Sequence, residues 1–117
     1  MSIPLHNSDL IRGSIDTFIL RVLLDEDNYG YQIIKEIMQR SAGQFELKEP
    51  TLYSSLKRLE KQGLITSYWG EETQGGRRKY YHLTLEGSSR LEHNREEWHA
   101  ARKIIDILIG DGKEQDK

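Results

Sequence analysis

The feature that most constrains the fold is a change in the spacing of apolar residues at Gly63. Before Gly63, apolar residues recur every three or four positions over residues 8–24, 31–40 and 51–62, which predicts three amphipathic helices. Pro50 fits the first turn of the third helix, because the missing N–H of proline has no helical partner there. Gly63 stands where a helix C-terminal cap is expected.

After Gly63 the pattern is that of strands, because residues 64–69 and 78–83 are rich in β-branched and aromatic side chains. A loop with paired glycines separates the two runs, which predicts a hairpin. Thr84 is then expected to cap a long helix over residues 85–109. Three helices followed by a hairpin predict a mainly helical α+β fold, a winged helix-turn-helix with a two-stranded β-hairpin wing and a long C-terminal dimerisation helix.

Composition excludes several classes of function for these 117 residues. The sequence contains no cysteine, which removes disulfides and thiolate metal ligands. No apolar run reaches the ~20 residues of a membrane span, and the first residues lack a signal-peptide core, so a cytoplasmic protein without membrane contact is expected. The four histidines form no convincing ligand set, and no catalytic motif is present. We therefore expect no metal, no cofactor and no enzymatic activity.

The charge of the chain is unevenly distributed, although its net value is only −2. Residues 51–84 carry six basic and three acidic side chains, a net charge of +3, and the rest of the chain carries −5. The basic part coincides with the predicted third helix and hairpin. This asymmetry indicates a localised contact with a polyanion.

The third helix and the hairpin carry side chains suited to DNA, polar or cationic on the helix and basic after the glycine turn. Each feature has an ordinary explanation, since polar helix faces are usually solvated and Gly-Gly usually serves turn geometry. The succession of a basic helix and a basic hairpin favours DNA binding. The expected contacts are Thr51, Tyr53, Ser54, Lys57 and Arg58 on the helix and Gly75, Gly76, Arg77, Arg78 and Lys79 in the wing, with Lys35 and Tyr29 as supporting phosphate contacts.

Six short motifs are typical of one known family: DNYGY (27–31), TLY (51–53), RLE (58–60), GLI (63–65), GGRRKYY (75–81) and LTLEG (83–87). Over about residues 8–109 the chain resembles the PadR family of transcriptional repressors. Its single C-terminal helix is similar to the subfamily of the lactococcal multidrug-binding repressor. The resemblance implies a homodimer on a palindromic operator of double-stranded DNA. In many such repressors a small aromatic or cationic effector weakens DNA binding.

The last helix carries an apolar seam with alternating spacings of three and four residues, the pattern of a heptad interface. Its length of ~37 Å is close to one turn of DNA, ~34–36 Å, so the helix could help to hold two DNA-reading domains one turn apart. We expect residues 1–84 to form the DNA-binding domain, 85–109 to dimerise and 110–117 to be a flexible tail. Leu5, Ile11 and Ile15 are expected to pack across the same interface. The seam residues are Leu91, Asn94, Trp98, Ala101, Ile105 and Leu108.

Trp98 has two interpretations, an apolar residue of the seam or an aromatic plate on which a flat ligand stacks. The first is the commoner role of a Trp at such spacing; the second is what the resemblance implies, because the multidrug-binding relative has Trp at the matching position, and both interpretations remain open. Arg95 and Arg102 lie one helical turn either side of Trp98, and Arg21 lies on the first predicted helix. These arginines would repel cationic drugs, so a pore at the dimer centre would either take anionic or neutral aromatics or hold no ligand. In the second case the arginines pair with Glu92, Glu96, Glu97 or Asp106. The expected ligand-binding residues are Trp98, Arg95, Arg102, Leu91 and Arg21.

Two functions of other classes remain open at this point. The first is a protein-interaction adaptor that uses the winged-helix scaffold without reading DNA. The second is a dimer that binds a small molecule or a metal and has catalytic side activity.

Overall fold

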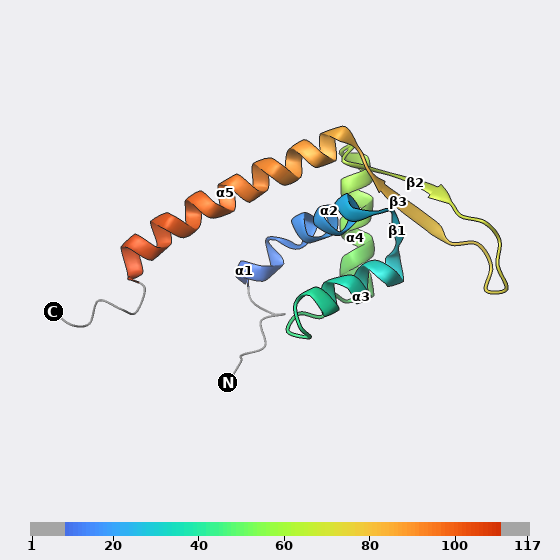
Figure 1. Ribbon diagram of the computed structural model, residues 1–117, viewed down its shortest axis with the longest axis horizontal. Helices are drawn as coiled ribbons and strands as arrows, with labels where there is room; N and C mark the ends of the chain where they lie inside the picture. Colours follow the sequence, from blue (N-terminus) through green and yellow to red (C-terminus); the bar gives the residue numbers. More distant parts are fainter. Residues whose placement is uncertain (1–8, 111–117) are drawn as a thin grey trace.

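The computed structural model of the protein describes residues 9–110, so Leu5, Ser8 and residues 111–117 of the predicted tail lie outside the described part. The α+β fold with mostly helices and a long C-terminal helix is confirmed (Figure 1). In chain order the elements are α1 (Asp9–Arg12), α2 (Ile15–Asp25), β1 (Asn28–Tyr29), α3 (Gly30–Arg40), α4 (Glu49–Lys61), β2 (Ile65–Trp69), β3 (Lys79–Leu83) and α5 (Leu85–Ile109).

The single first helix expected over residues 8–24 is wrong, because the chain turns at Gly13 and Ser14 between α1 and α2. The amide of Gly13 donates to the carbonyl of Asp9 at 3.1 Å, and that of Ser14 donates to Ile11 at 2.9 Å. The second contact spans only three residues and tightens the turn. Glycine has a poor helix propensity, so little helix stability is lost when the helix is interrupted at Gly13.

The core is formed where α2, α3 and α4 pack on one another and on the sheet. Ile19 of α2, Ile33 of α3 and Leu52 of α4 are fully buried. Leu56 and Leu59 continue the α4 row, each only 1% exposed. The predicted apolar face of the third helix is thus confirmed, and it leaves the opposite face of α4 directed outward.

The sheet has a third strand that the sequence pattern did not predict. Its order is β1-β3-β2, with both neighbouring pairs antiparallel. β1 contributes two residues, Asn28 opposite Tyr81 and Tyr29 opposite Tyr80. Two residues are too few for a recognisable strand period. The short strand joins the hairpin directly to the first residue of α3.

The start of α5 is fixed to the end of α4. The Thr84 hydroxyl oxygen accepts from the amide of Gly87 at 3.0 Å, which confirms the predicted cap, and the hydroxyl donates to the carbonyl of Gly63 at 2.8 Å. Gly63 has a φ of 77°, and the next amide, that of Leu64, donates to Leu59, which is a Schellman termination of α4. A Cβ on Gly87 would collide with the carbonyl oxygen of Leu64, so the two elements touch through backbone.

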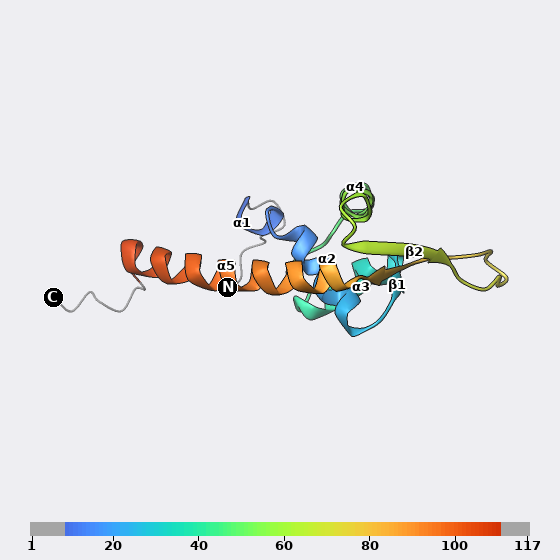
Figure 2. The same cartoon turned by 90° about the horizontal axis from the view of Figure 1, so that it is seen from above.

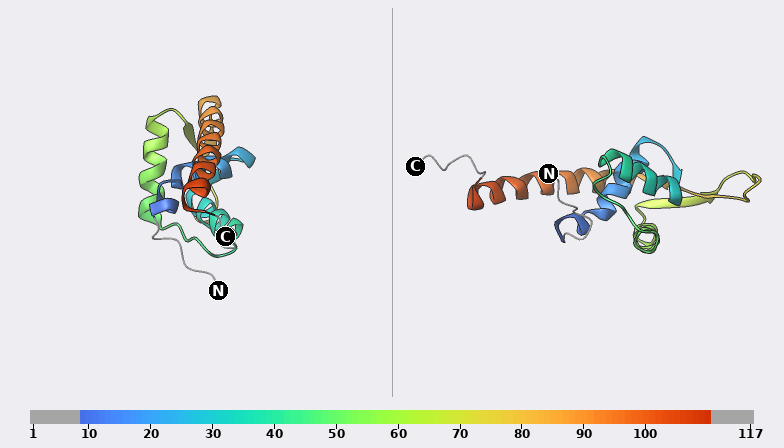
Figure 3. Two further views of the ribbon diagram at one scale, coloured as in Figure 1. Left: turned by 90° about the vertical axis from the view of Figure 1, so that its left-hand side faces the viewer. Right: turned by 90° about the horizontal axis from the view of Figure 1, so that it is seen from below.

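The molecule is elongated, with extents of 65 × 32 × 21 Å. Figure 1 shows the β2–β3 wing and α5 extending in opposite directions from the helical head, which is formed by α2, α3 and α4. Seen from above in Figure 2, α4 stands on one flank of the long axis, and the end-on view in Figure 3 shows the same offset. None of the helices in residues 9–110 has the length and apolar character needed to cross a bilayer.

The wing is held at its base by a polar cluster around Asp27. The Tyr68 hydroxyl of β2 donates to one carboxylate oxygen at 2.6 Å, and Nδ1 of His82 in β3 lies 2.8 Å from the other. Partial burial raises the pKa of Asp27, but these two hydrogen bonds together outweigh it and hold the pKa below its ordinary value. The same bond raises the pKa of the Tyr68 hydroxyl. Asp27 therefore joins the α2–β1 connection to both wing strands.

We predict that Asp27→Asn weakens the fold in a pH-dependent manner. A carboxylate with a lowered folded pKa stabilises the native state above its unfolded pKa, about 4, and loses this effect as pH falls through the folded value. Urea unfolding should show a loss of no more than ~1 kcal/mol at pH 7, since the site is partly exposed. The loss should shrink below pH ~4. Glu26→Gln, at the adjacent exposed carboxylate, is the control. A loss that is equal at pH 7 and pH 3 would contradict the prediction.

Candidate nucleic-acid interface and the groove beside α5

The outward face of α4 carries most of the side chains predicted to contact DNA. Thr51, Ser54 and Lys57 are exposed, and Tyr53 is 49% exposed. Their direction follows from the burial of the leucine row on the other side of the helix. Pro50 lies in the first turn of α4, as predicted. This face can therefore enter a groove of DNA without disturbing the core.

Arg58 lies on the same helix but is engaged within the subunit. Its Nε and one terminal nitrogen donate to the two carboxylate oxygens of Asp16 in α2, at 2.9 and 2.8 Å, and it also donates to the hydroxyl of Ser55 at 3.1 Å. The hydrogen bond and charge of Asp16 raise the pKa of the Arg58 guanidinium above its ordinary value. Arg58 ties α4 to α2 and offers less free charge than the sequence suggests.

In the wing, each of three successive basic residues lies near an aromatic ring. The guanidinium of Arg77 is 5.8 Å from the centroid of Trp69, and that of Arg78 is 4.4 Å from the centroid of Tyr29. Lys79 Nζ lies 5.9 Å from the ring of Tyr81. These are distances at which the ring face attracts a cation. The rings restrict the basic side chains without neutralising their charge.

The wing turns at the paired glycines. Thr73 and Gly76 form an isolated bridge with reciprocal backbone hydrogen bonds of 3.2 and 2.9 Å. Gly76 has a φ of 94°, a conformation that glycine adopts without strain. A Cβ on Gly75 would meet no atom within 4 Å, so its surroundings are open. Both glycines thus lie at the exposed tip, ahead of the three basic residues.

A cleft of about 360 Å³ lies between the wing, the start of α3 and α4. It brings together five of the residues predicted to contact DNA, from three separate parts of the chain: Tyr29, Tyr53, Arg77, Arg78 and Lys79. The remaining wall is formed by Gly30, Tyr31 and Tyr81. Thr51, Ser54, Lys57, Lys35 and the two wing-tip glycines do not line it.

The sequence reasoning missed two exposed aromatic residues of this region. Tyr31, 59% exposed, lines the cleft, and Lys35 Nζ lies 5.4 Å from its ring. Trp69 is exposed beside Arg77 at the end of β2. Both were assigned to elements by their apolar character. Two sequence signals could have indicated them: Lys35 lies four positions after Tyr31, and Trp69 directly precedes the wing loop that ends at Arg77.

A second concavity, an open groove of about 750 Å³, runs between α1, α2 and α5. All five residues predicted to bind a ligand line it: Arg21, Leu91, Arg95, Trp98 and Arg102. The guanidinium of Arg102 lies 5.6 Å from the centroid of the Trp98 ring. The groove thus joins an exposed indole to three arginines from two helices.

Carboxylates accompany each of these arginines. Arg95 pairs with Glu92 at 3.1 Å, and Arg102 lies 3.9 Å from Asp106. Arg21 pairs with Asp25 at 2.8 Å. Two of the pairings expected in the absence of a ligand, with Glu92 and with Asp106, are therefore present within the helix.

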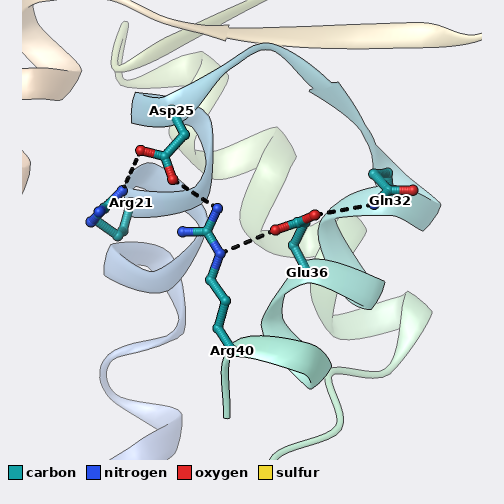
Figure 4. Close-up of polar contacts among 5 residues, drawn as sticks. All are labelled: Arg21, Asp25, Gln32, Glu36 and Arg40. Atoms are coloured by element: carbon teal, nitrogen blue, oxygen red, sulfur yellow. Dashed lines mark hydrogen bonds and ion pairs between the residues drawn. The ribbon is translucent and has the colours of Figure 1, made fainter. Parts of the chain in front are cut away.

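Figure 4 shows how Asp25 links Arg21 of α2 to Arg40 of α3, with both arginines at 2.8 Å from the carboxylate. Arg40 also pairs with Glu36, to which Gln32 donates. The hydrogen bond from Arg21 lowers the pKa of Asp25 most, and Arg40 adds to it against the opposing effect of desolvation. The orientation of Arg21 at the edge of the groove therefore depends on α3.

The predicted seam of α5 divides into two halves. Leu91, only 3% exposed, belongs to the hydrophobic core, and Asn94 donates to the Thr17 hydroxyl at 2.9 Å. From Trp98 onward, Ala101, Ile105 and Leu108 are exposed. Ile15, which was expected at the same interface, is buried within the subunit instead, while Ile11 lines the groove. Three further isoleucines near the end of α5 are also exposed: Ile104, Ile107 and Ile109.

The histidines of α5, His93 and His99, each lie beside another side chain of the same helix. In residues 9–110 no three His, Asp or Glu side chains gather in an arrangement that could hold a metal ion. His93 pairs with Glu97 at 3.4 Å, and the ring of His99 meets Trp98 edge-on.

Comparison with known proteins agrees with this geometry. The model of the transcriptional regulator PadR-like family matches residues 19–93. The chain is similar to the structure of a transcriptional regulator from Clostridium thermocellum, with 46% identity and a TM-score of 0.82 over 87% of this chain and 96% of that one. A PadR family transcription regulator from Clostridium difficile is 44% identical, with a TM-score of 0.73 over 84% and 100% of the two chains.

The sequence is also similar to that of a named transcriptional regulator. Transcriptional regulator YqjI of Escherichia coli is 35% identical over 85 residues, which cover 73% of this chain and 39% of that protein. The family match extends from Ile19 in α2 through α3, α4 and the wing to the first part of α5. The chain therefore belongs to the PadR-like family of transcriptional regulators, winged helix-turn-helix DNA-binding proteins rather than enzymes.

Proposed function

We propose that this regulator is a repressor that binds a palindromic operator as a homodimer, with α4 in the major groove and the wing on the adjacent backbone. The observation that supports this most directly is the cleft where Tyr53 of α4 meets Arg77, Arg78 and Lys79 of the wing. A surface that combines an exposed polar helix with a basic hairpin suits simultaneous contact with base edges and phosphates.

The distribution of charge supports the same orientation. The segment 51–84 has a net charge of +3 and contains the wing and α4 from its third residue onward, while the rest of the chain, including Glu49 at the start of α4, carries −5. Electrostatic attraction to DNA is therefore concentrated on one part of the elongated molecule. The acidic remainder opposes non-specific approach of the other faces.

The double variant Arg77→Ala/Arg78→Ala tests DNA reading. Removing two phosphate-binding charges should weaken binding to all sequences and reduce the slope of log K against log salt by about 2 per subunit. Gel shifts over a salt series, on the DNA upstream of the protein's own gene, measure both effects. The control is Arg90→Ala/Lys103→Ala, which removes the same charge from α5.

Two results would contradict this proposal. Retardation by the double variant equal to that of the wild type would exclude the wing as a DNA contact. Failure of the wild-type protein to retard any duplex at low salt would favour a winged-helix adaptor that acts through protein contacts.

The exposed half of α5 supports a second copy of the chain as partner. Trp98, Ile105 and Leu108 follow the predicted heptad spacing and remain exposed in the single subunit. Apolar helix faces of this kind are usually buried against another helix. We assign residues 1–84 to DNA reading and 85–109 to dimerisation. The additional isoleucines near the end of α5 would broaden the interface beyond a narrow seam.

Ile105→Glu should convert the dimer into monomers. A charge at the centre of the exposed seam would have to be buried without a partner, which costs several kcal/mol. Sedimentation equilibrium of the full chain measures the dissociation constant, and circular dichroism checks that the helices persist. Lys103→Glu, at a nearby polar position of α5, is the control. An unchanged dissociation constant for Ile105→Glu would place the interface elsewhere.

The groove beside α5 supports an effector that is a neutral or anionic aromatic compound. Trp98 provides a stacking surface, and Arg21, Arg95 and Arg102 make the walls unfavourable for a free cation. The carboxylates that pair with these arginines moderate this preference. The cationic drugs typical of the similar subfamily therefore fit this groove less well than an aromatic acid.

Fluorescence of Trp98 tests the effector site, in a Trp69→Phe background that leaves one tryptophan. Titration with 2-naphthoate should change the Trp98 emission, while a naphthyl trimethylammonium cation should have a weaker effect. Arg95→Gln/Arg102→Gln should reduce the difference between the two ligands, because it removes two positive charges from the wall. Equal responses to both ligands in the parent protein, or a response to the cation alone, would contradict the proposed preference.

A further inference from the structure

Tyr29 was expected to contact phosphate, but the structure places its ring in a stack of side chains at the base of the wing. The Arg78 guanidinium lies 4.4 Å from the Tyr29 centroid. Tyr29 meets Tyr80 edge-on at 5.5 Å, and Tyr80 stacks on Tyr68 at 5.8 Å with an interplanar angle of 16°. Tyr29 thus stands between the wing arginine and the aromatic residues of both wing strands.

The backbone of Arg78 is fixed in addition to its side chain. Its carbonyl accepts from the amide of Gly70 at 2.7 Å. Gly70 itself has to lack a side chain, because a Cβ there would lie 2.6 Å from the Tyr80 ring. The Tyr80 ring therefore packs directly against Gly70, the residue whose amide binds the Arg78 carbonyl. The Arg78 guanidinium lies over the Tyr29 ring from this fixed backbone position.

The next residue links the same point to the reading helix. Gly30 is buried at the start of α3, directly beneath the Tyr53 hydroxyl, where a Cβ would collide at 2.6 Å. Tyr29 is therefore adjacent to the residue on which an α4 side chain rests, and it also contacts the wing. The dipeptide Tyr29-Gly30 touches both parts of the proposed DNA interface, and both residues line the cleft between them.

We propose that Tyr29 is a positioning residue: its ring face holds the Arg78 guanidinium toward the DNA backbone. This inference rests on the proposed DNA-reading function. A cation–π contact suits the task, because it orients the guanidinium while leaving all of its N–H donors for phosphate oxygens. An ion pair, as between Arg58 and Asp16, would use those donors within the protein.

The first experiment uses the free protein and requires no DNA. The side-chain Hδ protons of Arg78 should show an upfield ring-current shift in NMR spectra of the full chain. The shift should be retained in Tyr29→Phe, which keeps the ring, and lost in Tyr29→Leu, which removes it. An Arg78 spectrum that does not respond to Tyr29→Leu in a folded variant would overturn the proposed contact.

The second experiment measures DNA affinity in a double-mutant cycle of Tyr29→Leu and Arg78→Ala. Tyr29→Leu alone should weaken binding about three-fold per wing, and about ten-fold in a complex with two wings, from the usual strength of an exposed cation–π contact. In the Arg78→Ala background the same change should have almost no effect. A loss that is equal in both backgrounds would show a purely structural role for Tyr29 and overturn the proposal.

A third series keeps the shape of the ring and therefore avoids any dependence on the folding of Tyr29→Leu. Phenylalanine and its mono-, di- and trifluoro derivatives at position 29 progressively weaken the negative ring face. DNA affinity should fall stepwise along the series and stay flat along it in Arg78→Ala. A flat response in the Arg78 protein would overturn the proposal. Absence of DNA binding by the wild type would instead contradict the DNA-reading function, and the NMR result would stand independently.

Discussion

The burial of the leucine row of α4 is the constraint on which the rest of the structure depends. Leu52, Leu56 and Leu59 occupy the centre of the core between α2, α3 and the sheet. Because one side of the helix is committed to the core, the other side can be polar and exposed, which is the property a reading helix needs. The Schellman turn at Gly63 then sends the chain directly into β2, so the wing begins beside α4.

Features that depend on local sequence were predictable, and those that depend on distant partners were not. The α4 leucine period, the Gly63 termination and the Thr84 cap each involve residues a few positions apart, so pattern and propensity suffice. β1 exists only because Asn28 and Tyr29 meet a strand about 50 residues later. The Arg58–Asp16 pair joins residues 42 positions apart, and no spacing rule indicates it. Leu91 is buried because of the direction in which α5 leaves the head.

Five arginines of the described residues lie in three different electrostatic environments. In the wing, Arg77 and Arg78 lie against rings and keep their charge available. In the head, Arg58 and Arg40 are paired with carboxylates and serve packing between helices. Beside α5, Arg102 has both kinds of neighbour, the Trp98 ring and Asp106. The partner of each arginine, more than its exposure, separates structural cations from those able to meet an anionic ligand.

The backbone contact between Gly87 and Leu64 has a mechanical consequence. It joins α5 to the chain that leaves α4 through direct steric contact, without a flexible linker between them. A helix of 25 residues is a lever of ~37 Å, so a tilt of about 5° at this fulcrum displaces its far end by about 3 Å. A force on the exposed end would act on this contact with a lever arm of the same length. The Gly87–Leu64 contact therefore couples the tilt of α5 to the position of the chain that leaves α4.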